Sequence, residues 1–380
     1  MSEQESKDYE YGERQTEDMS EVALRVGQGR ISGAISIALG AISVLSVLAY
    51  RYPTWLTTAE LRKSYDGETL RLVLMACMVA AFVFGVLTFA LNRRKRLGAL
   101  GVLLTVLAYA LGGWNVEIGT IQEAPVSLGV DWLVLDLLGS AILFIFIEKV
   151  IPRHPEQAVL RPEWQLDLFY FALNHLLIAF LIVLANGFAP KAFGWAVNES
   201  FQAQVQSLPL AVQVLLLALC ADFVLYWVHR AFHEFPRLWP FHAVHHCAEH
   251  MDWLAGSRTH LVQTIVDRTL VMIPLYLLGT TEQALNLYVA LAALQAVFTH
   301  ANVGIPTGPL KYVLVTPQYH HWHHSSDQPA IDTNYAVHFP LFDRLFGTYH
   351  MPDQHWPIAY GTTKRLPRTF WGQLLHPFRP

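Results

Sequence analysis

The sequence predicts an all-α protein, a multi-pass membrane helix bundle that carries a histidine-rich helical cap. Two observations lead to this prediction. The 380 residues are 53% hydrophobic and only 15% charged, which is too apolar for a soluble protein of this length. Twelve of the 18 histidines fall between His229 and His324, directly after a long apolar run.

Membrane helices are predicted where an apolar run approaches the roughly 20 residues that cross a bilayer. Two shorter runs, Ile265–Gly279 and Ala284–Phe298, are predicted to form a hairpin that enters the membrane only in part. The clear runs are Ile31–Tyr50, Leu72–Leu91, Leu97–Trp114, Trp132–Phe146, Leu168–Ala185 and Leu208–Val228.

The basic residues predict the orientation of these helices, because cytoplasmic loops are enriched in Lys and Arg. The strongest basic cluster, residues 93–96, lies between the second and third runs. Placing it in the cytoplasm also places there the N-terminal tail and the loop with Lys149, Arg153 and Arg161. The end of the sixth run then falls on the same side, so the histidine cap is predicted to be cytoplasmic.

Four segments are predicted along the chain. Residues 1–28 are polar and acidic, which indicates a disordered tail, and they lack the basic start and early apolar stretch of a cleavable signal peptide. Residues 29–205 form an N-terminal transmembrane region, and residues 206–365 form a catalytic domain. Residues 366–380 are interpreted as a C-terminal tail.

The first histidine pair is His229 and His233, four residues apart at the end of an apolar helix. This spacing puts both side chains on one helical face. Asp222 lies seven residues earlier on that face, and an acidic group in a membrane helix is costly and usually functional. Because ligating imidazoles usually donate their second N–H to a carboxylate or carbonyl, Asp222 is a candidate to support the ligands.

Two H-x-x-H-H triplets follow, each with its histidines on one helical face. Imidazole suits iron, zinc, copper and nickel, and eight such groups exceed what one ion uses, so the pattern predicts a site for two metals. His300 ends the second run of the hairpin, which returns it to the same side as a further ligand. The predicted ligands are His229, His233, His242, His245, His246, His300, His320, His323 and His324.

Several neighbouring residues receive other interpretations. Arg258 and His260 are candidates to support the ligands or to face a substrate. His250 is interpreted as solvated, and His321 is expected to point away from the shared face of its triplet. Cys247, directly after His246, is a less favoured soft ligand.

Composition also limits the possible chemistry. The net charge is −4 and no basic patch with interleaved aromatics is present, which argues against nucleic acid as a partner. The site is rich in nitrogen and lacks the Glu-x-x-His pairs of soluble di-iron helix bundles. Neutral imidazoles leave a high positive charge on bound metals, which fits dioxygen activation and also a Lewis-acid hydrolase.

The order of the three boxes, HRAFH, HAVHH and HHWHH, resembles the fatty acid hydroxylase superfamily, also called the sterol desaturase family. Supporting motifs are D-x-x-x-Y-W from Asp222, T-P-Q-Y-H from Thr316, N-Y at Asn334 and D-R-L-F-G-T-Y from Asp343. The resemblance covers roughly Leu208–Pro352. The sequence departs from the family at Leu261, where many members have proline, and at His250, where acidic or small polar residues are common.

This resemblance implies an integral membrane, non-haem di-iron oxygenase that hydroxylates or desaturates a lipid (fatty acyl, sterol, ether lipid or carotenoid-type). It implies two Fe²⁺ ions, O₂ as co-substrate, and ligand roles for the eight histidines of the three boxes, with His300 as a further match. No fused haem-binding carrier is visible, so it also implies a separate electron donor: a cytochrome or ferredoxin with its reductase, or a pterin. The alternatives are a membrane metal transporter and a noncatalytic metal-binding sensor.

Overall fold

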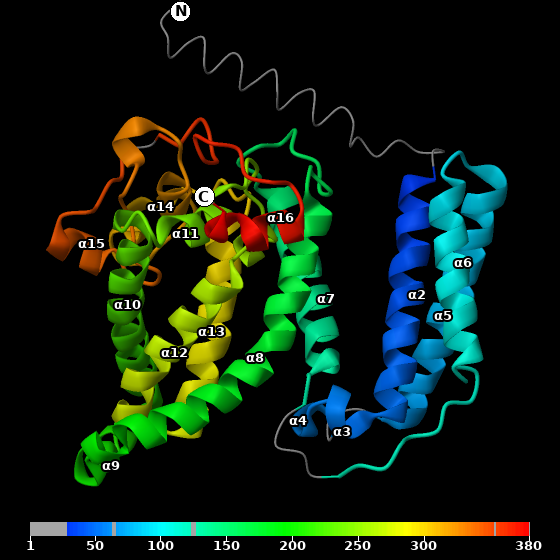
Figure 1. The fold of residues 1–380 in the computed structure, drawn as a ribbon, viewed down its shortest axis with the longest axis horizontal. Helices are drawn as coiled ribbons and strands as arrows, with labels where there is room; N and C mark the ends of the chain where they lie inside the picture. The colour runs from blue at the N-terminus through cyan, green and yellow to red at the C-terminus, as the bar shows by residue number, and fades with distance from the viewer. Residues whose placement is uncertain (1–28, 63–65, 123–126, 353–354, 380) are drawn as a thin grey trace, which may run out of the picture. The chain divides into compact units, whose positions relative to one another are not determined.

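The computed structural model describes residues 29–62, 66–122, 127–352 and 355–379, and within them every regular element is helical. The predicted acidic tail, residues 1–28, lies outside the described residues. The prediction of an all-α chain is therefore confirmed (Figure 1). The chain divides into two compact units between Gly139 and Ser140, inside helix α7 (Val130–Val150).

The N-terminal unit is built on three helices, α2 (Arg30–Arg51), α5 (Gly67–Leu91) and α6 (Lys95–Ala110), with the short α3 (Pro53–Leu56) and α4 (Ala59–Arg62) between the first two. Small residues line the contacts. The Ser36 hydroxyl donates to the carbonyl of Ala81 at 2.7 Å, and Gly98 lies against Gly85 with no room for a Cβ. Small side chains at such positions let membrane helices approach closely.

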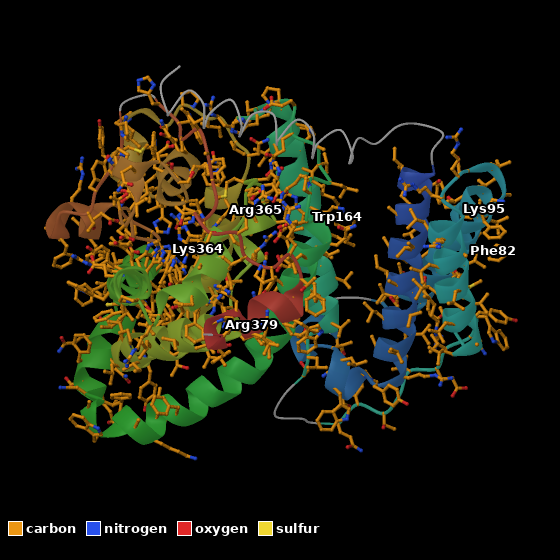
Figure 2. The ribbon with its side chains drawn as sticks, turned by 45° about the horizontal axis from the view of Figure 1, so that its top comes forward. Phe82, Lys95, Trp164, Lys364, Arg365 and Arg379 are labelled. Carbon is orange, nitrogen blue, oxygen red and sulfur yellow. The ribbon has the colours of Figure 1, made fainter. Side chains whose placement is uncertain are left out.

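In the part of the chain that the structure describes, five helices are long and apolar enough to cross a membrane: α2, α5, α7, α10 (Leu210–Glu234) and α12 (Leu261–Leu278). This supports a multi-pass membrane protein. Their outer faces are apolar, as shown by Phe82 on α5, which is 47% exposed, while Lys95 marks the start of α6 (Figure 2). Helix α12, the first half of the predicted hairpin, is among the five, so its length permits a full crossing.

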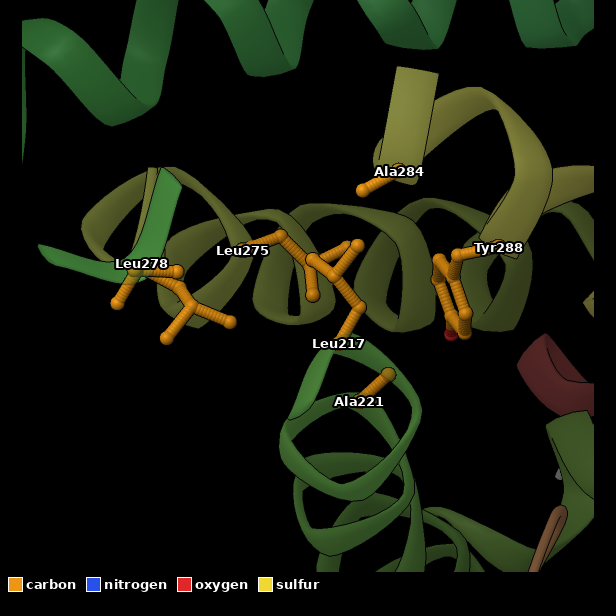
Figure 3. Packing of buried hydrophobic residues seen from close by; sticks show 7 residues of the cluster. Leu217, Ala221, Leu275, Leu278, Ala284 and Tyr288 are labelled. Atoms are coloured by element: carbon orange, nitrogen blue, oxygen red, sulfur yellow. The ribbon is translucent and has the colours of Figure 1, made fainter. Parts of the chain in front are cut away.

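The second unit packs four long helices together: α8 (Trp164–Phe193), α10, α12 and α13 (Glu282–His300). Leu217 of α10, Leu275 of α12 and Tyr288 of α13 are buried together in the core between three of them (Figure 3). The α8–α10 connection contains η1 (Gly194–Ala196) and α9 (Glu199–Gln206). This packing brings the ends of α10 and α13 to the same face of the unit (Figure 1).

Short helices cover that face and form the cap. They are α11 (Trp239–His246), η2 (Ala255–Ser257), η3 (Gly308–Tyr312), α14 (Pro317–His323), η4 (Gln328–Ala330), α15 (Leu341–Phe346), α16 (Phe370–Leu375) and η5 (His376–Phe378). The last two lie in the segment interpreted as a tail. That segment is folded onto the cap, since Phe370 packs on Phe169 of α8 and Phe378 on Phe241 of α11.

Candidate metal centre

The histidines of the centre come from four helices that end at the cap. His229 and His233 occupy the last turns of α10, and His300 is the final residue of α13. Each triplet sits on a short helix, α11 or α14, as the spacing predicts. Helix α14 begins at Pro317 behind Thr316, whose hydroxyl accepts from the N–H of Tyr319, so its start is fixed locally.

The nine predicted ligands gather into two groups whose ligand atoms lie within 4.8 Å of one another in each group. Both triplets contribute to both groups. Group A contains His229, His233, His242, His246 and His323. Group B contains His245, His300, His320 and His324. Cys247 and His321 belong to neither group; the ring of His321 bonds the Tyr360 hydroxyl at 2.9 Å, facing away as predicted.

For most of these histidines, one ring nitrogen faces away from the centre and donates a hydrogen bond, which fixes the tautomer. In group A, Nδ1–H of His229 donates to the Tyr335 carbonyl at 2.7 Å. Nδ1–H of His242 donates to the side-chain oxygen of Gln263 at 2.9 Å. A carbonyl oxygen can only accept, so Nδ1 carries the proton. The Nε2 lone pair of each ring is therefore free and points inward.

These inward lone pairs lie at distances that suit ligands of one shared cation. The Nε2 atoms of His229 and His242 are 2.9 Å apart, and those of His245 and His300 are 3.3 Å apart. Because all four rings are protonated at Nδ1, neither pair can form a hydrogen bond. Two nitrogens about 2.1 Å from one ion lie about 3.0–3.4 Å apart, so both groups fit a metal.

Further orphaned atoms support the same interpretation. The Nε2 atoms of His233 and His323 are buried and have no hydrogen-bond partner, although their Nδ1 atoms are bonded. An unpartnered buried polar atom is costly unless a ligand satisfies it. The donor set of both groups is imidazole alone, which suits iron, zinc, copper or nickel better than magnesium or calcium.

Burial keeps the cap histidines neutral, which is the form that binds metal. Desolvation lowers the pKa of His245 to about 3, with the neighbouring His300 acting in the same direction. Desolvation also lowers the pKa values of His246 and His320 well below 6.5. No carboxylate belongs to either group, so bound cations would keep most of their charge.

The candidates for supporting roles behave differently from one another. The carboxylate of Asp222, a candidate to support the ligands, accepts from the backbone N–H groups of Val337, His338 and Phe339, at 2.7–3.0 Å. Arg258 does support a ligand, through its carbonyl, which accepts from Nδ1 of His245 at 3.0 Å.

The remaining two candidates lie outside both groups. His260 caps α12 by accepting from the N–H of Val262, and its other nitrogen donates to the carbonyl of Leu374. His250 was expected to be solvated, but it is only 5% exposed. The expectation was wrong because the fold buries this side chain near Arg161 and Arg368, which lie far from it in the sequence and which its local sequence does not reveal.

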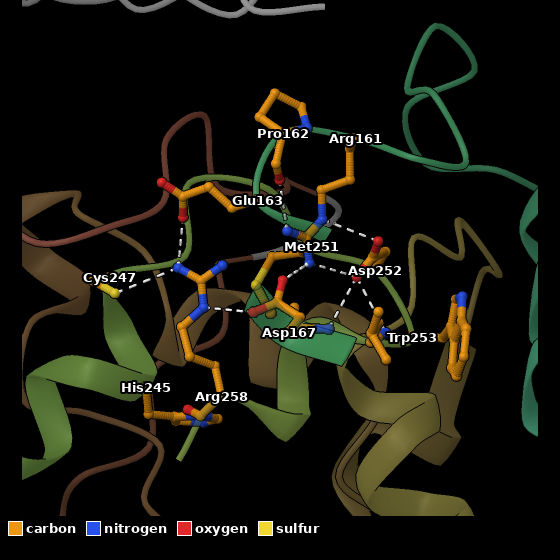
Figure 4. A network of polar contacts seen from close by, with 12 residues as sticks. Arg161, Pro162, Glu163, Asp167, His245, Cys247, Met251, Asp252, Trp253 and Arg258 are labelled. Carbon is orange, nitrogen blue, oxygen red and sulfur yellow. Dashed lines mark hydrogen bonds and ion pairs between the residues drawn. The ribbon is translucent and has the colours of Figure 1, made fainter. Parts of the chain in front are cut away.

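A buried ionic network lies behind group B (Figure 4). The guanidinium of Arg258 donates to Asp167 at 2.5 Å and to Glu163 at 2.7 Å, and Arg161 pairs with both Asp167 and Asp252. Both arginines are almost fully buried. The network joins the start of α8 to the segment between α11 and α12, and thereby fixes the carbonyl that holds His245.

Sequence reasoning missed most of the acceptors that orient the ligands. Gln263 and Asp332 act through side chains, whereas Thr333 and Tyr335 act through carbonyl oxygens. The N-Y motif offered the only signal, because it contains Tyr335. A backbone carbonyl carries no residue signature, so the spacing of histidines could not reveal the others.

Comparisons with known proteins agree with this site. Residues 214–348 match the model of the Fatty acid hydroxylase family, a segment that contains all nine histidines. The ornithine lipid hydroxylase OlsE of Rhizobium tropici is 38% identical over 170 residues, 45% of this chain and 51% of the relative.

Two further relatives share shorter parts of their length. Alkylglycerol monooxygenase of Homo sapiens is 32% identical over 143 residues, 37% of this chain and 31% of the relative. Very-long-chain aldehyde decarbonylase GL1-1 of Oryza sativa subsp. indica is 30% identical over 167 residues, 40% and 26% of the two chains. The chain thus spans about half the length of the first relative and a third or less of the others. No solved structure matches the chain.

The fold and the site together define a class: helical multi-pass membrane proteins whose cap encloses two buried histidine groups able to hold metal. Within that class, residues 214–348 are similar to the Fatty acid hydroxylase family, and the ornithine lipid hydroxylase shares this similarity with the chain. The resemblance seen in the three histidine boxes is confirmed.

Proposed function

We propose that the chain is a membrane-bound non-haem di-iron oxygenase that uses O₂ to hydroxylate or desaturate a lipid. One observation carries the proposal: each of the two histidine groups brings its ring nitrogens within 4.8 Å of one another, inside a family-matched segment at the ends of apolar helices. Bound iron ions would supply the redox chemistry with O₂ that oxidation of an unactivated C–H bond requires. The nine histidines are the proposed ligands.

The protein groups would supply geometry, charge and exclusion of water. The buried cap surrounds the ligands, and the outer hydrogen bonds hold their rings in one orientation. The neutral, carboxylate-free donor set leaves positive charge for an anionic oxygen species. The substrate would reach the site from the bilayer beside α10, α12 and α13, whose ends carry or approach the ligands.

The names of the relatives support a lipid substrate, since they include an ornithine lipid hydroxylase and an alkylglycerol monooxygenase. We propose a cytoplasmic position for the cap, from the basic residues 93–96, and a catalytic domain over residues 206–365. Hydroxylation reduces the second oxygen atom of O₂ to water, so two electrons must come from a separate donor. A cytochrome or ferredoxin with its reductase, or a pterin, would fill that role.

Metal analysis and O₂ consumption test the proposal together. Purified protein should contain about two iron ions per chain, and it should consume O₂ when given a reductant and a lipid extract. His245→Ala should lower both values, whereas His355→Ala, which changes an exposed histidine outside both groups, should lower neither. Fewer than two ions in the wild type, or no loss in His245→Ala, would contradict the proposal.

The two alternatives gain no support from the site. Transport sites lie near the membrane midplane on broken helices, but these histidines lie at helix ends under a folded cap. Metal flux in proteoliposomes would favour a transporter. Metal binding without O₂ consumption, in the presence of reductant and lipid, would favour a sensor.

A further inference from the structure

We infer that the outer hydrogen bonds of the two metal subsites come from different parts of the chain, and that residues 332–339, here called the acceptor loop, accept from rings of group A and from no ring of group B. The inference rests on the proposed metal-binding function and adds to it an asymmetry between the subsites. Three rings of group A donate Nδ1–H to this loop. The acceptors are the Asp332 carboxylate for His233, the Thr333 carbonyl for His323 and the Tyr335 carbonyl for His229, at 3.1, 2.8 and 2.7 Å.

Group B takes its acceptors from other parts of the chain. His245 donates to the Arg258 carbonyl at 3.0 Å, and His300 donates to the Ala296 carbonyl one turn back in its own helix, at 2.7 Å. Neither acceptor belongs to the acceptor loop. Arg258 is fixed by the ionic network behind α8, and Ala296 is fixed by helix α13. Among the described residues, no hydrogen bond from the Nδ1 of either ring goes to the loop, so a change at residues 332–335 leaves these two bonds in place.

The acceptor loop is itself held from both ends by buried carboxylates. Asp222 binds the N–H groups of residues 337–339, and Asp343 binds the N–H groups of Tyr335 and Ala336. Asp343 also accepts from the Tyr319 hydroxyl of α14 at 2.7 Å, which ties the loop to the second triplet.

The conformation of the loop shows that its position is imposed by these contacts. Asp332 and Asn334 adopt φ values of 58° and 59°, in the left-handed region that residues other than glycine rarely occupy. The Asn334 side chain compensates by binding the backbone of His350 in both directions, at 2.6 and 2.7 Å.

Asp332 is the position at which the loop can be tested without disturbing the core. Its side chain is 50% exposed, while the ring of His233 is buried. Among the described residues, no other carboxylate accepts a hydrogen bond from a histidine ring of group A or group B. Loss of such an outer partner typically lowers metal affinity about 10–100-fold.

Group B has its own test position at Gly256 in η2. A Cβ at this residue would stand 2.6 Å from Nδ1 of His300 and within 3.0 Å of two further ring atoms. Gly256→Ala must therefore displace the His300 ring, which belongs to group B. Gly256 has no contact with the acceptor loop among its nearest atoms.

Titration of the metal-free, full-length protein with Co²⁺ alone separates the subsites, because bound Co²⁺ gives an absorption spectrum that depends on its ligands. The wild type should bind two ions. Asp332→Gly tolerates the positive φ and should weaken one ion about 10–100-fold while the other keeps its wild-type affinity. Asp332→Asn keeps an oxygen acceptor and the same backbone preference, so it should restore most of that affinity.

The companion variants complete the test. Gly256→Ala should weaken binding of the Co²⁺ ion held by group B. The part of the absorption spectrum that it removes should differ from the part that Asp332→Gly removes. Glu156→Gln is the matched control, because Glu156 is an exposed carboxylate paired with His154, which lies outside both groups. Equal weakening of both ions, or of neither, in Asp332→Gly would overturn the inference. A wild type that binds no Co²⁺ would instead overturn the proposed function.

Discussion

His242 shows how one ring is prepared for metal by a residue that sequence reasoning overlooked. Its Nδ1–H donates to Gln263 of α12, and its Nε2 faces both His229 and His246, at 2.9 and 3.0 Å. Gln263 is in turn bonded to Asp267 at 3.3 Å, so its amide orientation is fixed. The ring is therefore oriented by a helix of the membrane bundle rather than by the cap.

Replacing Gln263 with methionine should weaken metal binding without unfolding the chain. The side chains have similar volume, but methionine cannot accept the Nδ1 proton of His242, and affinity at group A should fall about 10–100-fold. Equilibrium dialysis against Co²⁺ measures the change. Gln213→Met is the control, because Gln213 is buried and donates to the Leu208 carbonyl at 2.8 Å, outside both groups and the acceptor loop; an equal loss there would mean that packing is responsible.

His250 should make stability depend on pH. Desolvation, aided by the charge of Arg161, lowers its pKa in the folded chain to about 3. The unfolded chain therefore binds the proton first, at about pH 6.5. The stabilising contribution of neutral His250 is complete above pH 6.5 and is lost as the pH falls toward 3, by about 1.4 kcal/mol per pH unit at most.

The His250→Asn variant tests this contribution. Between pH 6.5 and 5.5 in detergent, wild-type stability should fall more than that of the variant, by up to about 1 kcal/mol. Thermal unfolding of metal-free protein measures both slopes, which removes the competing effect of metal on the other histidines. Parallel slopes would show that His250 is already protonated or accessible in the folded chain.

The residues of the centre could be predicted only in part. The nine histidines were predictable because their spacing places them on single faces of helices that end at one cap. Their acceptors were not, because Tyr335 and Arg258 act through carbonyl oxygens, and Asp332 lies 99 residues from His233 in the chain. Asp222 was singled out by its cost in an apolar helix, but its partners could not be predicted because backbone N–H groups carry no pattern.

Helix α10 links the membrane and the metal site at the scale of elements. Its apolar face packs against α12 and α13, and its last turns present His229 and His233. Asp222 sits between these two regions and binds three consecutive N–H groups of the acceptor loop. The apolar runs predicted the long helices, but they did not predict that a loop 115 residues later would be fixed to α10.

Removing the Asp222 carboxylate should therefore destabilise the folded chain. Each buried N–H left without an acceptor costs about 1–3 kcal/mol, and three lose theirs in Asp222→Ala. The unfolding midpoint should fall substantially. Asp222→Asn keeps one oxygen and should be intermediate. The midpoint in detergent measures both variants, and an Asp222→Ala chain as stable as the wild type would show that water or the backbone replaces the carboxylate.

At the scale of the whole molecule, the charge distribution predicts that residues 93–96 and the histidine cap share one side of the membrane. A cysteine introduced at Arg94 and another at the exposed Lys364 should react with an impermeant thiol reagent from the same side only. Right-side-out and inverted vesicles distinguish the two sides. Labelling of the two positions from opposite sides would contradict the predicted topology.

The number of membrane helices was harder to predict than their existence. Hydropathy marks apolar runs but does not distinguish a helix that crosses from one that packs partly inside the protein. Helix α12 was expected to enter only in part, yet its 18 residues are sufficient to cross. Helix α6 has 16 residues, shorter than the run that predicted it, because the helix ends at Ala110 before two consecutive glycines, Gly112 and Gly113.

The docked C-terminal segment has a practical consequence for producing this protein. Gln373 donates to Cys247 beside the second histidine box, and the carbonyl of Leu374 accepts from the cap residue of α12. Truncation after residue 365, which keeps all the family motifs, would remove these two hydrogen bonds to α11 and α12. An affinity tag would therefore be better carried at the other terminus, and a loss of yield on shortening would report damage to the cap rather than to the membrane helices.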